Sequence, residues 1–404
     1  AAAYAFDNGT LLVGAAGDEN SYHHNFPAML DNAVYVHSIR HNTPDDDNQV
    51  GSYMNTWNCN NYGSRMVMVA PSGACATGSC AVTTGVIGLI HSAARDLGLE
   101  LSAGEVYQLM VHSVDDVHLT DEERNVTRAY PSKEGWDAFY GYGRVNVGRA
   151  VQRLIDGAIP PVVSMDSPAW YAVLNPARTA DVAIEARISS RAAPFEYVVE
   201  AGLGHEPSDW RELNRGTSTE PIDGEVARYE TADALTEPIP EASRSEDVVE
   251  RLERVNAPAV TIRIRVTDSD GQSGEMRKVF YVTPDQGLLE GFPIDMGASG
   301  ESSPILVDLD DDGVLEVVIG TADGVVNAYY GDGTMVDGWP VEANASERLH
   351  YDSAPFADGT IDPGVGDSFT GTVAAADIDG DGDVEVVGAS QWGGVYAWHA
   401  DGSR

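Results

Sequence analysis

The sequence has few lysines and no long apolar run, and each scarcity excludes a class of protein. Lys133 and Lys278 are the two lysines, and 24 basic residues stand against 64 acidic ones, a formal net charge of −40 over 404 residues. This charge argues against nucleic-acid binding, because phosphate would be repelled. No segment approaches the roughly 18 consecutive apolar residues that a membrane-spanning helix needs. An acid-rich, lysine-poor surface stays soluble in salt and suggests a saline habitat.

Cysteine is also scarce, and the three that occur, Cys59, Cys75 and Cys80, lie close together in the chain. A Cys59–Cys75 or Cys59–Cys80 disulfide would fit an extracellular protein, whereas Cys75–Cys80 would close a very small loop. Three buried thiols are the alternative. No C-x-x-C pair is present, so a zinc site is not expected.

Length and composition predict several domains. The apolar fraction of 43% is enough for sizeable cores, and 42 glycines with 20 prolines indicate many turns and much β structure. We predict three regions: an α/β region over residues 1–157, a β-sandwich over 158–286 and a region of β-repeats over 287–404.

The first region alternates apolar strands with amphipathic helices. Strands are expected over residues 10–16, 33–39 and 66–70, and a helix over 82–97. A second helix follows Ser102, with Glu105 three residues later in the spacing of a capping box. Strands alternating with helices in this way predict a parallel sheet.

Five blocks of this region resemble the subtilisin-like (S8) serine peptidase family. In chain order they begin with LLVGAAGDEN, NFPAMLDNAVYVHSI and NCNNYGSRMVMVAPSG. They continue with CATGSCAVTTGVIGLI and with the closing pair LSAGEVYQLMVHSV and GYGRVNVGRAV. The resemblance implies the C-terminal part of a subtilisin-like domain. It also implies that the catalytic aspartate and histidine of the family would lie before Ala1.

The same resemblance assigns the candidate catalytic positions, and at these positions the chain has residues that differ from those of the family. The nucleophile position falls on Thr77, with Ser79 as the alternative if two residues of the following helix are deleted. Such a deletion would rotate the rest of the helix by about 200°. The oxyanion position is Asp18, whose ionised carboxylate cannot donate a hydrogen bond; losing one such donor costs roughly 10²–10³ in rate. We therefore expect a non-catalytic domain.

The second region follows a linker over residues 157–161. Its segments VAIEARISS, FEYVVEAG, PAVTIRIRVTD and RKVFYVT alternate apolar and polar residues, the period of half-buried strands. The region resembles an immunoglobulin or fibronectin type III sandwich, and residues 222–254 are expected to be an acidic insertion. Trp210 is expected to anchor the core or an edge strand.

The third region contains an internal repeat, in which Asp-x-Asp-x-Asp-Gly-x-x-Glu occurs twice. Carboxylates at the first, third, fifth and ninth positions, with a backbone carbonyl from the seventh, offer the oxygen ligands that Ca²⁺ takes. The candidate calcium ligands are Asp308, Asp310, Asp312, Val314 and Glu316 in the first copy, and Asp377, Asp379, Asp381, Asp383 and Glu385 in the second. The units resemble FG-GAP/VCBS repeats, the blades of integrin-α-like β-propellers, and fewer than the roughly four blades of a propeller are visible.

Three hypotheses for function follow. The first is a secreted or cell-surface protein with an inactive peptidase-like domain, acting in adhesion or assembly with other surface proteins. The second is an active S8 serine endopeptidase in its full-length form, and the third is a regulatory pseudopeptidase that binds a peptide. We expect a protein or peptide partner, and Ca²⁺, bound by the third region, is the expected cofactor.

Overall fold

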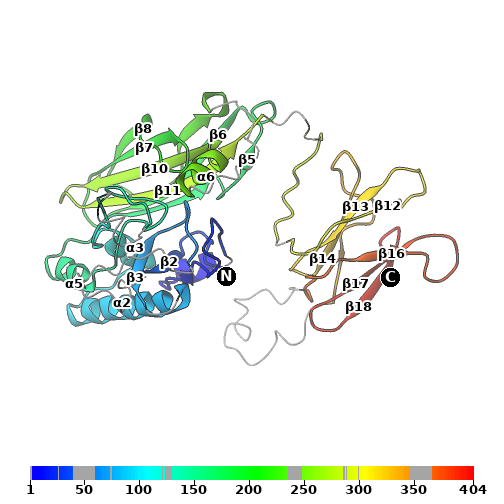
Figure 1. Cartoon of the computed structure of the whole chain (residues 1–404), viewed down its shortest axis with the longest axis horizontal. Helices are drawn as coiled ribbons and strands as arrows, with labels where there is room; N and C mark the ends of the chain where they lie inside the picture. The colour runs from blue at the N-terminus through cyan, green and yellow to red at the C-terminus, as the bar shows by residue number, and fades with distance from the viewer. Residues whose placement is uncertain are drawn as a thin grey trace. The chain divides into compact units, whose positions relative to one another are not determined.

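The chain forms two compact units in a computed structural model, residues 1–285 and residues 286–404 (Figure 1). The residues that the structure describes are 2–25, 27–39, 60–72, 75–120, 122, 130–234, 248–284, 287, 289–298, 300–344 and 366–404. None of the helices within these ranges combines the length and the apolar character needed to cross a bilayer. The first unit contains both the predicted α/β region and the predicted sandwich.

A parallel sheet forms the centre of the α/β region. Its strands are β1 (Val13–Ala15), β2 (Val34–Ile39) and β3 (Met68–Pro71), in the order β1-β2-β3. Both pairings are parallel, as predicted, and every residue of β2 is buried. The helices are α1 (Ala2–Asp7), α2 (Ala76–Asp96), α3 (Ala103–Val111) and α5 (Val147–Ile155). Helix α2 lies along one face of the sheet (Figure 1).

The N-termini of helices α3 and α2 can be compared with those predicted from the sequence. The capping box before α3 is confirmed: Ser102 Oγ accepts from the Glu105 nitrogen at 3.2 Å, and Glu105 Oε2 accepts from the Ser102 nitrogen at 2.8 Å. Helix α2 begins at Ala76 and not at the expected residue 82. The small residues before position 82 do not break a helix once the sheet supports it, so the predicted loop was too long.

Two further sheets face each other across one apolar core and form the sandwich. One has the order β4-β6-β9 and the other the order β5-β11-β10-β7-β8. Their bounds are β4 (Val162–Ser167), β5 (Val173–Leu174), β6 (Asp181–Ser189), β7 (Phe195–Leu203), β8 (Arg211–Ser218), β9 (Ile222–Glu230), β10 (Ala259–Asp268) and β11 (Ser273–Val282). The core between them includes Ile184, Val199, Val226, Ile264 and Phe280.

The expectation of an acidic insertion over residues 222–254 is wrong at both described ends. Residues 222–230 form β9, which pairs with β6 and buries Val226 and Tyr229. Near the other end, Val248–Val255 forms helix α6, where Leu252 is buried. Acidic residues alternate with apolar ones along β9, so one face of the strand enters the core while the other stays solvated. Trp210 packs under arginine side chains of the sandwich, with the Arg263 guanidinium carbon 3.9 Å from its ring centroid.

The two lysines of the chain both join the α/β region to the sandwich. Lys133 Nζ lies 2.6 Å from Glu206 Oε2, and Lys278 Nζ lies 3.0 Å from Asp31 Oδ1. Lys278 is fully buried, whereas the Asp31 side chain is 44% exposed. Tyr22 adds a hydrogen bond between the two regions, because its hydroxyl donates to Asn256 Oδ1 at 3.0 Å.

The second unit contains two open antiparallel sheets that share one core. The first has the order β12-β13-β14-β15 and the second the order β16-β17-β18, and neither closes into a barrel or propeller within the described residues. Their bounds are β12 (Ile305–Val307), β13 (Glu316–Gly320), β14 (Val325–Tyr329), β15 (Val341–Glu342), β16 (Ala374–Ala376), β17 (Glu385–Ala389) and β18 (Val395–His399). Trp339, Phe369 and Trp398 are buried between the sheets.

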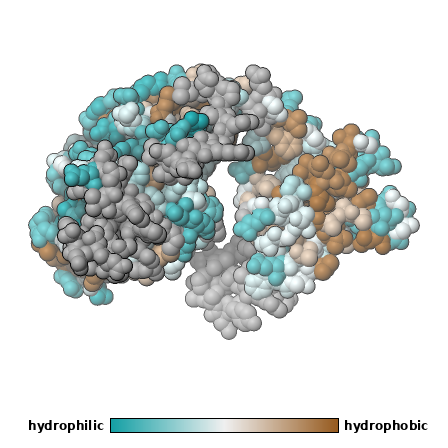
Figure 2. Space-filling view, viewed as in Figure 1, coloured by the Kyte–Doolittle hydropathy of each residue, from teal (hydrophilic) through white to brown (hydrophobic). Residues whose placement is uncertain are grey.

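Apolar side chains also lie on the surface of this second unit. Figure 2 shows hydrophobic residues gathered over it. Leu306, Ile378 and Val395 are 64%, 57% and 73% exposed. An isolated unit of this kind therefore presents apolar surface to solvent.

Candidate functional site

The start of helix α2 holds all three positions assigned by the peptidase resemblance. Thr77 and Ser79 both lie in its first turn, and Asp18 lies on the loop after β1. Asp18 Oδ1 accepts a hydrogen bond from the Ala76 nitrogen at 3.0 Å. The amide at the beginning of the helix is thus occupied by a carboxylate of the same chain. An incoming carbonyl oxygen would meet a negative charge there.

Neither hydroxyl in this turn has the surroundings of a nucleophile. Ser79 is fully buried, and its Oγ donates to the Ala76 carbonyl oxygen at 2.6 Å, so the hydroxyl is turned back into the helix. Thr77 is exposed to solvent. Within the described ranges, no hydrogen bond joins either residue to a histidine, which a nucleophile needs as its base.

Three of the described histidines of the α/β region are largely removed from solvent, whereas His23 is exposed and its Nδ1 lies 3.8 Å from Glu19 Oε2. His37 is buried, and its ring nitrogens face the backbone carbonyls of Ser38 and Phe139. Burial lowers the pKa of His24 to about 3 and that of His112 to about 4, so both are neutral at pH 7. His41 lies outside the described residues.

The cysteines divide into two kinds. Cys75, directly before α2, is disulfide-bonded, and Cys80 is a free thiol. Cys59 lies outside the described residues. A disulfide is typical of proteins that fold in an oxidising compartment.

The two acidic loops of the second unit have the same local geometry. Each joins antiparallel strands, β12 to β13 and β16 to β17, as the sequence predicted. In the first loop, Asp308 Oδ2 accepts from the Gly313 nitrogen at 2.9 Å, and Glu316 Oε2 accepts from the Leu309 nitrogen at 2.7 Å. Gly313 has φ +85°, a left-handed conformation that glycine adopts without strain.

The second loop repeats these contacts 69 residues later. Asp377 Oδ2 accepts from the Gly382 nitrogen at 3.2 Å, and Glu385 Oε2 accepts from the Ile378 nitrogen at 3.0 Å. Gly382 has φ +101°. Because each loop is held by its own backbone donors, its carboxylates are oriented before any ion arrives.

Three carboxylates converge in each loop. Ligand oxygens lie within 4.8 Å of one another in Asp308, Asp310 and Glu316, and likewise in Asp377, Asp379 and Glu385. Asp312 and Asp381 each turn one oxygen onto their own loop, toward the nitrogens of Val314 and Asp383. The participation of these four residues as ligands stays a prediction.

Glu316 distinguishes the first loop from an ordinary acidic turn. The residue is 1% exposed, and its Oε1 is buried without a hydrogen-bond partner among the described residues. Burial raises the pKa of Glu316, and the neighbouring carboxylates raise it further. A buried carboxylate oxygen without a donor is costly, and a bound cation would remove that cost.

The equivalent oxygen of the second loop has a partner. Glu385 Oε1 lies 3.1 Å from Nδ1 of His399, which is 46% exposed. The strand pairing places Glu385 directly opposite His399. The two loops are therefore similar in backbone and different in the surroundings of the ninth-position glutamate.

The sequence reading missed a cavity in the first unit, between the α/β region and the sandwich. Its residues come from three separate segments, 131–139, 203–206 and 252–257. No spacing rule links segments so far apart in the chain. The one available sequence signal was Lys133, one of only two lysines in a very acidic chain. It forms an ion pair with Glu206 in the wall of this cavity.

Known proteins are similar to this chain only in part. No protein-family model and no curated protein matches it. Among solved structures, it is similar to the prenylagaramide maturation protease PagA, with 16% identity and a TM-score of 0.27 over 38% of this chain and 53% of that one. It is also similar to an S218A mutant of the protease domain of PatA, with 21% identity and a TM-score of 0.28 over 39% of this chain and 52% of that one.

A third solved structure, tripeptidyl peptidase 2, aligns with 80% of this chain and 26% of its own, with 13% identity and a TM-score of 0.37. The chain covers about half of the length of the first two structures. At these identities and TM-scores, none of the likenesses decides the fold or the activity.

Proposed function

We propose that this chain is part of a secreted or cell-surface scaffold, with a non-catalytic subtilisin-like region and with β-repeats that bind Ca²⁺. In this proposal the sandwich is an immunoglobulin-like spacer, the repeats are of the FG-GAP/VCBS kind, and the whole serves adhesion or assembly with other surface proteins. The five sequence blocks support the peptidase origin, and the disulfide at Cys75 supports the oxidising compartment.

One observation carries the metal part of the proposal. The unpartnered Oε1 of Glu316 is buried beside Asp308 and Asp310, and the backbone contacts and the carboxylate cluster of this loop recur in the loop of Glu385. An all-oxygen set of carboxylates is the ligand type that Ca²⁺ prefers, and Zn²⁺ would favour nitrogen or sulfur. A bound ion would satisfy the orphaned oxygen and neutralise the clustered charge.

The loss of catalysis is supported by the contacts of Asp18 and Ser79. Asp18 is a hydrogen-bond acceptor at the position where the resemblance expects an oxyanion donor, and Ser79 has its hydroxyl turned into the helix. Without a nucleophile and an oxyanion donor, the subtilisin-like region would contribute its shape and its surface to the scaffold. The apolar side chains on the second unit provide surface for association with other proteins.

Calorimetric titration of the metal-free chain with Ca²⁺ tests the proposal. We expect about two equivalents to bind, and about one in either Glu316→Gln or Glu385→Gln. The double variant should bind none, while Glu301→Gln, which removes an exposed glutamate elsewhere in the second unit, should bind as the parent does. Undiminished binding in the double variant would overturn the assignment of both loops.

Thermal unfolding gives an independent readout. Ca²⁺ at 100 times its Kd should stabilise the second unit by about 2.7 kcal/mol for each occupied loop, because the ion binds only the folded loops. EDTA should remove this stabilisation from the parent and change nothing in the double variant. An identical melting curve with and without EDTA in the parent would contradict the proposal.

A further inference from the structure

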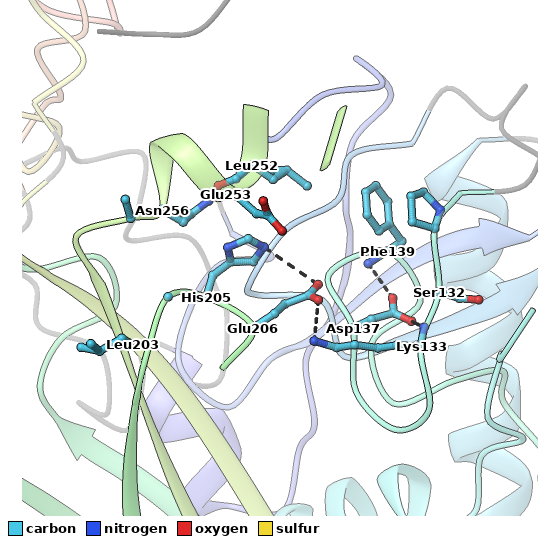
Figure 3. Close-up of a pocket in the computed structure, with 13 residues that line it drawn as sticks. Ser132, Lys133, Asp137, Phe139, Leu203, His205, Glu206, Leu252, Glu253 and Asn256 are labelled. Carbon is cyan, nitrogen blue, oxygen red and sulfur yellow. Dashed lines mark hydrogen bonds and ion pairs between the residues drawn. The ribbon is translucent and has the colours of Figure 1, made fainter. Parts of the chain in front are cut away.

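A cavity of about 490 Å³ lies within the first unit, where the sandwich meets the α/β region. Its walls come from the loop of residues 131–139, from the end of β7 and the residues after it, and from the end of helix α6 (Figure 3). The volume lies in the range of pockets that hold small organic ligands. It shares no lining residue with the helix α2 turn or with either acidic loop.

Part of the polar lining is already used to build the walls. Asp137 accepts from the nitrogens of Lys133, Phe139 and Tyr140, at 3.3, 2.8 and 2.7 Å. Glu206 accepts from the Ala138 nitrogen at 2.5 Å and pairs with the Lys133 ammonium. Burial raises the pKa of Asp137 to about 8, and the negative charge of Glu206 raises it further. These contacts fix the loop against the sandwich.

His205 is buried in the wall and has its hydrogen-bonding capacity unused. The residue is 6% exposed, and within the described ranges no hydrogen bond is made by either ring nitrogen. The carboxylate oxygen Oε1 of Glu206 lies 3.9 Å from its Nε2 (Figure 3). Burial lowers the pKa of His205 to about 4, so that a neutral ring presents an acceptor nitrogen at pH 7.

Among the described residues of the lining, the charge that is left unpaired is negative. Lys133 and Glu206 neutralise each other, and Glu253 of helix α6 adds an exposed carboxylate with no cation paired to it among the described residues. Phe139, Leu203 and Leu252 add apolar side chains to the lining, beside the polar Ser132 and Asn256. An anion would meet Glu253 and find its one ammonium already engaged.

We propose that this cavity binds a small organic cation, in which a protonated amine or guanidinium is attached to an apolar body. The cationic head pairs with the Glu253 carboxylate and donates a hydrogen bond to the imidazole of His205. The apolar body lies against Phe139, Leu203 and Leu252 and is removed from water. The net charge of −40 raises the local concentration of such a cation around the whole chain.

Calorimetry with three probes of the same body tests the proposal: 4-phenylbutylamine, 4-phenylbutan-1-ol and 4-phenylbutyrate. We expect the amine to bind at least about tenfold more tightly than the alcohol, because it adds a charge-assisted hydrogen bond. The carboxylate should bind more weakly than the alcohol. Absence of measurable amine binding, or equal binding of the amine and the alcohol, would overturn the proposal.

Variants place the binding in this cavity. Glu253→Gln should weaken the amine at least about tenfold and leave the alcohol unchanged, because only the charge of the site is lost. Glu250→Gln, on the same helix but outside the cavity lining, should bind the amine as the parent does. Since Glu253 is exposed, its replacement is compatible with folding, which an unchanged melting curve verifies. Full retention of amine affinity in Glu253→Gln would overturn the proposal.

Discussion

The carboxylate of Asp18 lies 3.0 Å from the backbone nitrogen of Ala76, the first residue of helix α2, and accepts its hydrogen bond. Cys75, at the N-cap position, supplies no side-chain cap of its own. A residue 58 positions earlier therefore does the work of a cap. At the position where the peptidase resemblance expects an oxyanion donor, the chain holds an acceptor that stabilises the helix.

Replacement of Asp18 should therefore lower stability. Asp18→Ala should reduce the free energy of unfolding of the first unit by about 0.5–2 kcal/mol, the usual worth of a cap. Asp18→Asn keeps an acceptor oxygen and loses only charge, so it should cost less, about 0.3–1 kcal/mol. Urea unfolding measures both. Asp96→Ala, at the opposite end of the same helix, is the control and should be neutral or slightly stabilising, because a carboxylate there opposes the helix dipole.

The chain should not react with an active-site probe for serine hydrolases. We expect no fluorophosphonate adduct at Thr77 or Ser79 by peptide mass spectrometry, because no base activates either hydroxyl within the described structure. Thr77→Ser should remain unlabelled as well, since removal of a methyl group supplies no base. An adduct at either position in the folded parent, absent after denaturation, would revive the hypothesis of an active endopeptidase.

Acid should destabilise the first unit through His24. Its folded pKa of about 3 lies below its ordinary value of 6.5, so the folded state cannot take up the proton that the unfolded state binds. The stability is complete above pH 6.5 and is lost as the pH falls toward 3, with a loss of about 2 kcal/mol expected at pH 5 from this group.

His24→Phe keeps the aromatic contacts with Tyr22 and Tyr171 and removes the titration. Its unfolding free energy should fall less between pH 7 and pH 5 than that of the parent. His91→Phe is the control, since His91 belongs to no aromatic cluster among the described residues. A parent and a His24→Phe variant with the same pH profile would show that His24 is not the group responsible.

The ion pair between Lys278 and Asp31 should show unequal effects when either partner is removed. Asp31→Ala leaves a fully buried ammonium without its counter-charge and should cost about 2–4 kcal/mol. Lys278→Met keeps the apolar volume and frees only a half-exposed carboxylate, so it should cost less than about 1.5 kcal/mol.

The double variant should resemble Lys278→Met alone, because the cost of Asp31→Ala depends on the charge that the second change removes. Denaturant titrations of all four proteins measure these values. An equal cost for the two single variants would contradict the account of a buried lysine held by a partly solvated aspartate.

Local rules were enough for the elements whose signals lie in adjacent residues. The alternation of strands with helices predicted a parallel sheet, and β1, β2 and β3 pair in parallel. Ser102 and Glu105 predicted a capping box that is present. The repeated aspartate spacing predicted two similar loops between strands, and the backbone contacts of Asp308 and Asp377 repeat. In each case the residues that interact lie within a few positions of one another or in one periodic pattern.

Local rules were wrong where distant residues supply the stabilisation. Helix α2 starts six residues before the apolar pattern does, because Asp18 and the sheet support its first turn. Strand β9 reads as an acidic insertion, yet Tyr229 and Val226 are buried by strands far away in the chain. Propensity is a weak preference of about 1 kcal/mol or less per residue, and such packing outweighs it.

The sequence by itself determined the chemical inventory: two lysines, a large excess of carboxylates, and two loops with the oxygen ligands of a hard cation. Tertiary structure alone decided what those groups do. It turned Asp18 into a helix cap, buried Ser79 and the free oxygen of Glu316, and set both lysines between the two parts of the first unit. The physical reason is that burial and charge pairing depend on neighbours in space, and spacing along the chain does not record them.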